Sequence, residues 1–346
     1  MKTDSQQNMT NRQISTFPLV GLASVIISCA TLGTAANAAD PRIESFVPQG
    51  AQRGSEATIA IHGARIGLAP QEIQFVRPGI TAGNLEAVNG KQVKAELSIA
   101  EDCPLGIHPL RVRTESGLSN LMTLHIGALA EVAEAEPNSD FQSPQQIPLD
   151  VVVNGVVQSE DVDYYSVEME EGARLSVEVE GLRLGRTFFD PAVSVFNAER
   201  FELASCDDHT LLRQDAYVNL IVPKTGRYII AVRETAYRGN NACTYRLHVG
   251  RFPRPAAVFP PGGRPGETLE VRWIGDAGGA WSETVTLPDA ETDEHPLLAS
   301  DASEISPSGI PVRVTDLPAT LEVEPNNNRN EASPTAVVIA ASRQGV

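Results

Sequence analysis

The chain has 346 residues, 42 % of them apolar and 5 % aromatic, which is enough for two or three ordinary domains and does not require one large enzyme core. Its 44 acidic and 27 basic residues give a formal net charge of −17, spread along the chain without a basic block. Phosphate binding needs clustered Lys and Arg, so this charge pattern argues against a nucleic-acid partner. Dispersed acidity is typical of a soluble surface, and local carboxylate clusters remain candidate sites for divalent cations.

The first 38 residues have the pattern of a signal peptide. Lys2 and Arg12 precede an apolar run over 17–32, and Ala36-Asn37-Ala38 supplies the small residues that a signal peptidase reads. An alternative remains open, because the residues before Cys29 resemble a bacterial lipobox, which would place a lipid anchor on that cysteine. No other segment approaches the roughly 18 apolar residues of a membrane span. We therefore expect a secreted, periplasmic or cell-surface bacterial protein.

After this segment, period-two alternation of apolar residues recurs and helical periodicity does not. We predict strands at 58–62, 110–114, 122–126, 175–180, 193–196, 218–222, 228–233, 245–249, 269–273 and 312–315. Each strand should present one face to a core and the other to water. Short strands at about ten-residue spacing, joined by Gly and Pro turns, predict an all-β protein of tandem antiparallel β-sandwich modules, immunoglobulin-like and jelly-roll-like.

Two internal similarities divide the chain further. Pro48-Gln49-Gly50 matches Pro260-Pro261-Gly262 at an offset of 212 residues, and the tripeptide Glu136-Pro137-Asn138 recurs at Glu324-Pro325-Asn326. We therefore predict module A at 39–130, module B at 131–250 and a second, shorter immunoglobulin-like module A′ at 251–323. Residues 324–346 then read as the start of an incomplete repeat of module B, which we expect to be disordered and to belong to a longer protein.

Module B resembles the bacterial pre-peptidase C-terminal domain, a β-sandwich that is appended to secreted proteases and other exported proteins. The resemblance covers about a third of the chain and is carried, in order, by Glu136-Pro137-Asn138, Gly155, Asp161-Val162-Asp163-Tyr164, Gly172, Asp190, Asp215, Gly226-x-Tyr228, Val232 and Tyr245-x-Leu247-x-Val249. It implies a domain that accompanies an activity located elsewhere. Several members of that family bind calcium through the segment at the entrance and the Asp-x-Asp element.

The same residues make a chemical case for calcium. Ca²⁺ takes six to eight oxygen ligands, and Glu136, Asn138, Asp161 and Asp163 supply carboxylate and amide oxygens if the linker folds beside the loop before Tyr164. Two aspartates two residues apart point the same way on an extended chain. The competing interpretation is that both aspartates make local turn hydrogen bonds and bind no metal. Tyr165 is expected in the core, and its neighbour at 164 at the edge of the sandwich.

Module A resembles the IPT/TIG class of immunoglobulin-like domains. The matching residues are Pro41-x-Ile43, Pro48-x-Gly50, Gly54, Ile59-x-Ile61-x-Gly63 and Thr114-x-x-Gly117-x-Ser119-Asn120. Module A′ matches module A at its first residues, Pro260-Pro261-Gly262, and its sequence then differs. We expect its Trp273 and Trp281 to pack in the core or at an edge.

The cysteines leave a redox question open. If Cys29 is set aside, Cys103, Cys206 and Cys243 remain. In an oxidising compartment Cys206 and Cys243 could pair, with Cys103 left over, and the alternative is three free thiols.

Catalytic motifs are scarce in this sequence. It contains no G-x-S-x-G, H-E-x-x-H, Walker A or G-x-G-x-x-G, and Asp207-Asp208-His209 is the only local ligand-like cluster, which reads as a solvated loop. The first hypothesis is an exported, non-catalytic modular protein for adhesion, for binding an extracellular protein or polysaccharide, or for spacing, with Ca²⁺ stabilising module B. The second is an accessory part of a secreted peptidase whose catalytic domain is absent from this chain.

Overall fold

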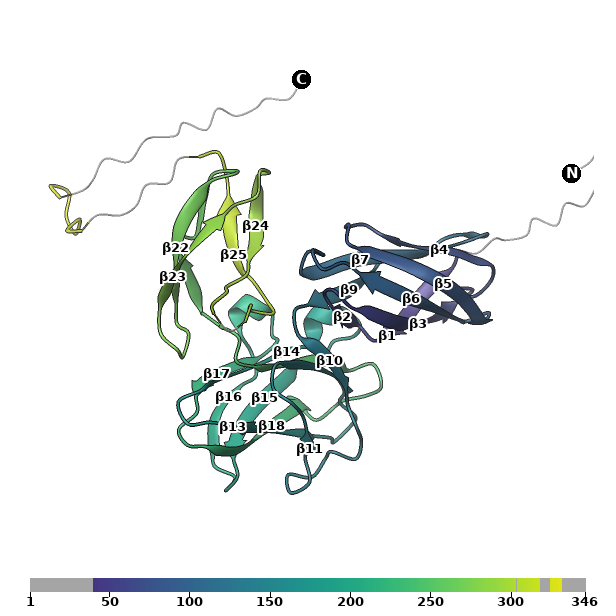
Figure 1. Cartoon of the computed structure of the whole chain (residues 1–346), viewed down its shortest axis with the longest axis horizontal. Helices are drawn as coiled ribbons and strands as arrows, with labels where there is room; N and C mark the ends of the chain where they lie inside the picture. Colours follow the sequence, from purple (N-terminus) through teal and green to yellow (C-terminus); the bar gives the residue numbers. More distant parts are fainter. Residues whose placement is uncertain (1–39, 303, 318–323, 332–346) are drawn as a thin grey trace, which may run out of the picture. The chain divides into compact units, whose positions relative to one another are not determined.

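The computed structural model describes residues 40–302, 304–317 and 324–331. The predicted signal peptide, the motif at Cys29 and residues 332–346 lie outside this part of the chain. The described residues form six β-sheets and two short 3-10 turns, which confirms the all-β class (Figure 1). No helix among them is long and apolar enough to cross a membrane. Every predicted strand overlaps an observed one.

Module A is a sandwich of a four-stranded and a five-stranded sheet. One sheet has the order β1 (Arg42–Val47), β3 (Glu56–Ala64), β6 (Gln92–Ile99), β5 (Ile80–Asn89). The other has the order β2 (Gly50–Gln52), β9 (Met122–Gly127), β7 (Gly106–Thr114), β4 (Pro70–Phe75), with β8 (Gly117–Leu118) beside β7. The alternation of β6 explains its place, because Val93, Ala95, Leu97 and Ile99 all point into the core and are at most 3 % exposed.

Module B is a sandwich of two five-stranded sheets. The first has the order β10 (Ala130–Ala133), β12 (Val151–Val156), β19 (Thr244–Gly250), β14 (Arg174–Glu180), β17 (Tyr217–Ile221). The second has the order β11 (Gln145–Gln146), β13 (Asp163–Met169), β18 (Gly226–Glu234), β15 (Pro191–Asn197), β16 (Glu202–Cys206). Both β10 and β11 pair parallel with their neighbours, so the sandwich is not purely antiparallel. The reason is that the segment 130–146 crosses from one sheet to the other and adds an edge to each.

The prediction of one solvated face is wrong for β14, β18 and β19. In β18, Ile229 and Ala231 lie on the face that was predicted to be solvated, and both are buried. Alternate residues of β14 do enter the core, but its other face is also buried, with Glu178 unexposed and Glu180 6 % exposed. Charged partners make this burial possible, since buried charges are retained where they are paired. Glu180 contacts Arg246 at 2.7 Å, His248 at 3.2 Å and His125 at 3.4 Å. The strict alternation of β14 therefore separates an apolar face from an ion-paired one.

Module A′ is a smaller sandwich of two three-stranded sheets. Their orders are β20 (Ala257–Phe259), β22 (Thr268–Ile274), β23 (Trp281–Thr286) and β21 (Gly262–Gly263), β25 (Ile310–Val314), β24 (Thr292–Leu297). Trp273 is unexposed, and its indole N–H donates to Glu283 at 2.8 Å. Trp281 is half-buried, with its ring centroid 6.0 Å from that of Trp273. The predicted packing role of both tryptophans is confirmed.

The two Glu-Pro-Asn tripeptides make the same local contact. The Asn138 N–H donates to the Glu136 carboxylate at 2.9 Å, and the Asn326 N–H donates to the Glu324 carboxylate at 2.8 Å. The tripeptide is therefore a turn with its own internal hydrogen bond.

Candidate metal centre

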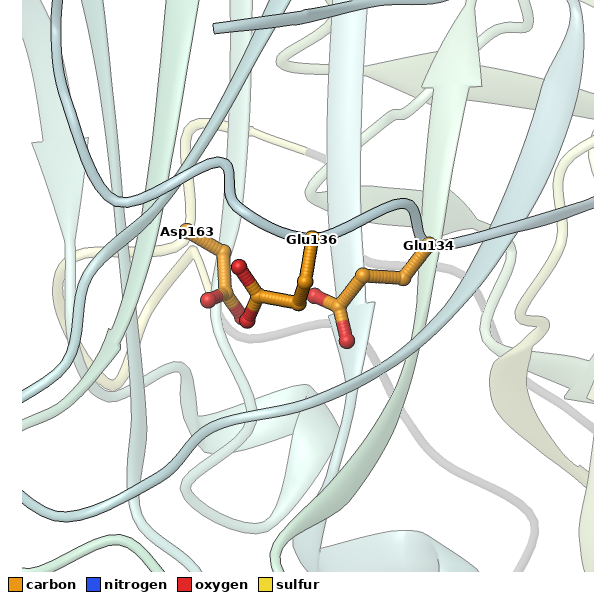
Figure 2. A group of neighbouring side chains, drawn as sticks. All are labelled: Glu134, Glu136 and Asp163. Atoms are coloured by element: carbon orange, nitrogen blue, oxygen red, sulfur yellow. The ribbon is translucent and has the colours of Figure 1, made fainter.

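Three carboxylates of module B meet where the segment between β10 and β11 passes the start of β13. The segment turns at Glu136-Pro137-Asn138 and is joined to β13 by the Tyr164 N–H, which donates to the Asn138 carbonyl at 3.0 Å. Asp163, the first residue of β13, points inward and is unexposed. Figure 2 shows its carboxylate beside those of Glu134 and Glu136, the last two carried by neighbouring turns of the same segment.

The three carboxylates are close enough to share one ion. Glu134, Glu136 and Asp163 each offer one oxygen, and these oxygens lie within 4.8 Å of one another. Burial decreases outward from Asp163, which is buried, through half-buried Glu134 to exposed Glu136. A cation could therefore enter from the side of Glu136. Within the described residues, this is the one group of three acidic, histidine or cysteine side chains whose possible ligand atoms lie this close together.

Two buried oxygen atoms in this group have no hydrogen-bond partner. They are Asn138 Oδ1 and Asp163 Oδ1, on side chains that are both unexposed. The Asn138 amide is oriented by its other end, since Nδ2 donates to Glu134 Oε1 at 3.3 Å. Leaving a buried acceptor unpaired costs about 1–3 kcal/mol, and more for a charged group. Two such acceptors beside two further carboxylates need an external partner.

Two tyrosine hydroxyls contact this group, and their two protons are too few for all of the contacts that they make. Tyr245 Oη lies 2.7 Å from Asp163, 2.9 Å from Glu134 and 2.5 Å from Tyr165 Oη, and Tyr165 Oη lies 2.8 Å from Glu134. Each hydroxyl carries one proton, so the two cannot donate along all four contacts. The cluster of oxygens lacks positive charge, which either an added proton or a cation would supply.

Burial and the neighbouring Glu134 charge raise the pKa of Asp163 to about 9. Burial, with the charges of the same carboxylates, also raises the pKa of Tyr165 and of Tyr245, so both phenols stay protonated. Without a cation the Asp163 carboxyl therefore holds a proton at neutral pH. A bound cation would replace that proton.

The donor set fits Ca²⁺. Three carboxylates and the Asn138 amide oxygen are hard oxygen ligands of the kinds that Ca²⁺ takes, with water completing six to eight positions. The absence of sulfur and imidazole from the group argues against zinc or copper as the preferred ion.

Of the four residues predicted from the sequence, Glu136, Asn138 and Asp163 lie together here. The carboxylate of the fourth, Asp161, accepts hydrogen bonds from the Ser139 hydroxyl at 2.7 Å and its neighbour's N–H at 2.9 Å, as in the alternative turn interpretation. Glu134 was not predicted. Its signal was the spacing Glu134-Ala135-Glu136, which puts two carboxylates on one side of an extended segment.

A glycine makes room for this group. A Cβ at Gly155 would lie 2.4 Å from the ring of Tyr245 and 2.9 Å from Glu134 Oε1. We expect Gly155→Ala to displace both side chains, to destabilise the protein by about 1–3 kcal/mol and to weaken Ca²⁺ binding. Urea unfolding with and without Ca²⁺ measures both effects, and an unchanged midpoint would show that the space is not needed.

The other candidate residues form no comparable group. The imidazole of His209 accepts a hydrogen bond from the Leu211 N–H at 3.3 Å and caps a 3-10 turn (Thr210–Leu212), while Asp207 and Asp208 are exposed. Their solvated-loop interpretation agrees with this arrangement.

The three described cysteines are free, and two of them are buried. Cys103 lies 3.7 Å from His108 Nε2. Burial raises the pKa of the thiol and lowers the pKa of the imidazole. Both groups are therefore neutral, unlike the thiolate of a catalytic pair.

The sequence matches no protein-family model and no curated protein. Among solved structures, the chain is similar to the pre-peptidase C-terminal domain of a collagenase from Bacillus anthracis, at 16 % identity over 34 % of this chain and 99 % of that one, with a TM-score of 0.25. It is also similar to the Escherichia coli adhesin FdeC, at 10 % identity over 81 % and 98 % of the two chains, with a TM-score of 0.21. The glucan-utilisation protein SGBP-B of Bacteroides ovatus matches at 10 % identity over 60 % and 52 %, with a TM-score of 0.22. At these TM-scores the three similarities support no conclusion about this chain.

Proposed function

We propose that this chain is an exported, non-catalytic modular protein whose middle module is stabilised by Ca²⁺. The observation that carries the proposal is the group of Glu134, Glu136, Asn138 and Asp163, which contains two buried oxygen atoms that lack a partner. The modules would serve adhesion, binding of an extracellular protein or polysaccharide, or spacing. That broader role rests on the tandem β-sandwich architecture and on the sequence motifs.

The structural role of the ion follows from where its ligands lie. Glu134, Glu136 and Asn138 belong to the crossing segment, and Asp163 opens β13. When bound, the ion neutralises the carboxylates and joins this segment to the second sheet. The segment forms an edge of both sheets through β10 and β11. Binding should therefore stabilise module B as a whole, because the ion binds the folded state alone.

Calorimetric titration of Ca²⁺ into chelator-treated protein tests the proposal. We expect one binding event per chain and a melting temperature that rises with Ca²⁺ concentration. Glu134→Gln should remove both effects, because it takes away one ligand charge from the middle of the group. Glu168→Gln is the matched control, since Glu168 lies exposed on the same β13 strand and outside the group. Absence of heat together with an unchanged melting temperature would reject the proposal.

A further inference from the structure

Module A′ repeats the framework of module A strand by strand. The offset of 212 residues found in the sequence carries β1 onto β20, β2 onto β21 and β3 onto β22. The pairings agree as well: β1 pairs with β3 as β20 pairs with β22, and β2 runs parallel to β9 as β21 runs parallel to β25. β23 therefore holds the position of β6, and β24 the position of β7.

Three strands of module A, the short β8 and the longer β4 and β5, have no counterpart in module A′. In module A the connection from β3 to β6 runs over residues 65–91 and contains β4 and β5, which cover β7 and β6. In module A′ the connection from β22 to β23 is only residues 275–280. Within the described ranges, no strand flanks β23 on its outer side (Figure 1). Module A′ therefore ends in an open edge where module A has an added strand.

Burial along β23 reflects the missing neighbour. The core-facing residues of β6 are fully buried, whereas Trp281, Glu283 and Val285 of β23 are only partly buried. Residues of the two strands hold the same position in the framework, so the difference comes from the absent flanking strand. A strand added to β23 would cover these side chains.

The free hydrogen-bonding groups of this edge can be assigned. The Leu287 N–H donates to the Glu267 carbonyl at 2.9 Å, which makes residues 267 and 287 a hydrogen-bonded pair of the β22–β23 ladder. Hydrogen-bonded pairs recur every second residue in an antiparallel ladder. Residues 281, 283 and 285 therefore bond to β22. The backbone N–H and C=O groups of Ser282, Thr284 and Thr286 point away from it, toward the open side.

The edge has few of the features that prevent strand addition. Natural edges carry Pro, exposed charges such as Lys, inward-pointing charges or a bulge. The open edge on β24 has them, with Pro296, the acidic residues Asp293 and Glu294, and a register shift between Thr292 and His295. β23 pairs with β22 in unbroken register, contains no Pro, Lys or Arg, and has a single charged residue, Glu283, whose carboxylate faces inward and accepts a hydrogen bond from Trp273. Its exposed side chains are small and uncharged.

We propose that β23 pairs antiparallel with β23 of a second copy of this chain, with Thr284 on the two-fold axis. In this register Thr284 faces Thr284 and Ser282 faces Thr286, which places outward-pointing backbone groups opposite one another. Glu283 then faces Val285. The register one residue away would oppose Glu283 to Glu283, and like charges directly opposite are unfavourable. The edge is thus self-complementary with Thr284 on the axis, and the register centred on Glu283 is disfavoured.

A single six-residue strand pair is a small interface, so the dimer should be weak and should form only at high protein concentration. Sedimentation equilibrium of the protein from micromolar to millimolar concentration should show a monomer–dimer equilibrium. Both tryptophans of the chain lie in module A′, so the half-buried Trp281 should also report assembly by a blue-shifted emission at high concentration.

Thr284→Pro removes the outward N–H at the centre of the pair and leaves the ladder to β22 intact, because edge positions facing solvent tolerate proline. We expect it to weaken the dimer at least about tenfold. Thr284→Ser keeps the N–H and should dimerise like the parent, and circular dichroism melting verifies that both variants fold. A parent chain that stays monomeric at millimolar concentration, or a folded Thr284→Pro variant that dimerises as the parent does, overturns the proposal.

Discussion

Asp163→Asn is expected to stabilise the metal-free protein and to abolish the stabilisation that Ca²⁺ gives. Asp163 is unexposed and its pKa is raised to about 9 by burial and the Glu134 charge, so in the metal-free state folding forces this carboxyl to take up a proton. Asparagine has the same shape and needs no proton. At neutral pH the metal-free variant should gain about 2–4 kcal/mol of unfolding free energy. The same change removes the most buried ligand charge, so its melting temperature should no longer respond to Ca²⁺.

The parent protein should show the corresponding pH dependence. Because the pKa of Asp163 is higher in the folded state than in the unfolded state, its contribution favours folding below about pH 4 and is lost as the pH rises toward 9. Ca²⁺ competes with the proton, so the rise in melting temperature on adding Ca²⁺ should grow with pH. Calorimetric melting of parent and variant from pH 5 to pH 8.5, with Ca²⁺ and with chelator, measures both slopes. A variant less stable than the parent in chelator would refute the assignment.

Glu178→Gln should cause the largest loss of stability outside the metal centre. Glu178 is unexposed, accepts a hydrogen bond from Arg183 at 2.9 Å and lies 2.6 Å from Arg254 Nε. The Arg254 guanidinium is itself 1 % exposed and stacks over the Tyr217 ring at 4.6 Å. Removing the carboxylate charge leaves this arginine buried without its counter-charge. We expect a loss of about 3–5 kcal/mol in chemical denaturation.

The pKa of Glu178 also predicts that the protein loses stability as the pH falls. We call this part of the stability profile the acid limb. Burial alone would raise the pKa of Glu178, but Arg254 and Arg183 outweigh it and hold the pKa below its usual value. A lowered pKa gives stability that is present above about pH 4.5 and is lost as the pH falls below it. Glu178→Gln should flatten that acid limb, and the exposed Glu168→Gln should leave it within about 0.5 kcal/mol of the parent. A Glu178→Gln variant as stable as the parent would show that the ion pair does not contribute.

The sequence predicted the fold class well because alternating apolar residues identify strands that have one apolar face. Leu175 and Val177 in β14, or Ile230 and Val232 in β18, enter the core as predicted. The same alternation is present in β6 through Val93 and Leu97, although no strand was predicted there. Strands of two or three residues, such as β2 and β11, have no periodicity to detect. They form because the neighbouring strand offers a free edge.

The metal centre was predicted in part for a similar reason. Glu136, Asn138 and Asp163 belong to local motifs, and the turn and the strand start bring them together. The contribution of Glu134 depends on Tyr165 and Tyr245, which converge on it from two different sheets. Likewise, the polar face of β14 reads as solvated in the sequence. Its burial depends on distant partners such as Arg254, and no local pattern encodes them.

The most direct measurement is the anomalous diffraction signal of crystals grown in Ca²⁺. The proposal predicts one peak in module B within about 2.3–2.6 Å of oxygen atoms from Glu134, Glu136, Asn138 and Asp163. It predicts that Asn138 Oδ1 and Asp163 Oδ1, which otherwise have no partner, are both ligands of that ion. A crystal grown in the same Ca²⁺ concentration that shows no peak beside these residues would contradict it.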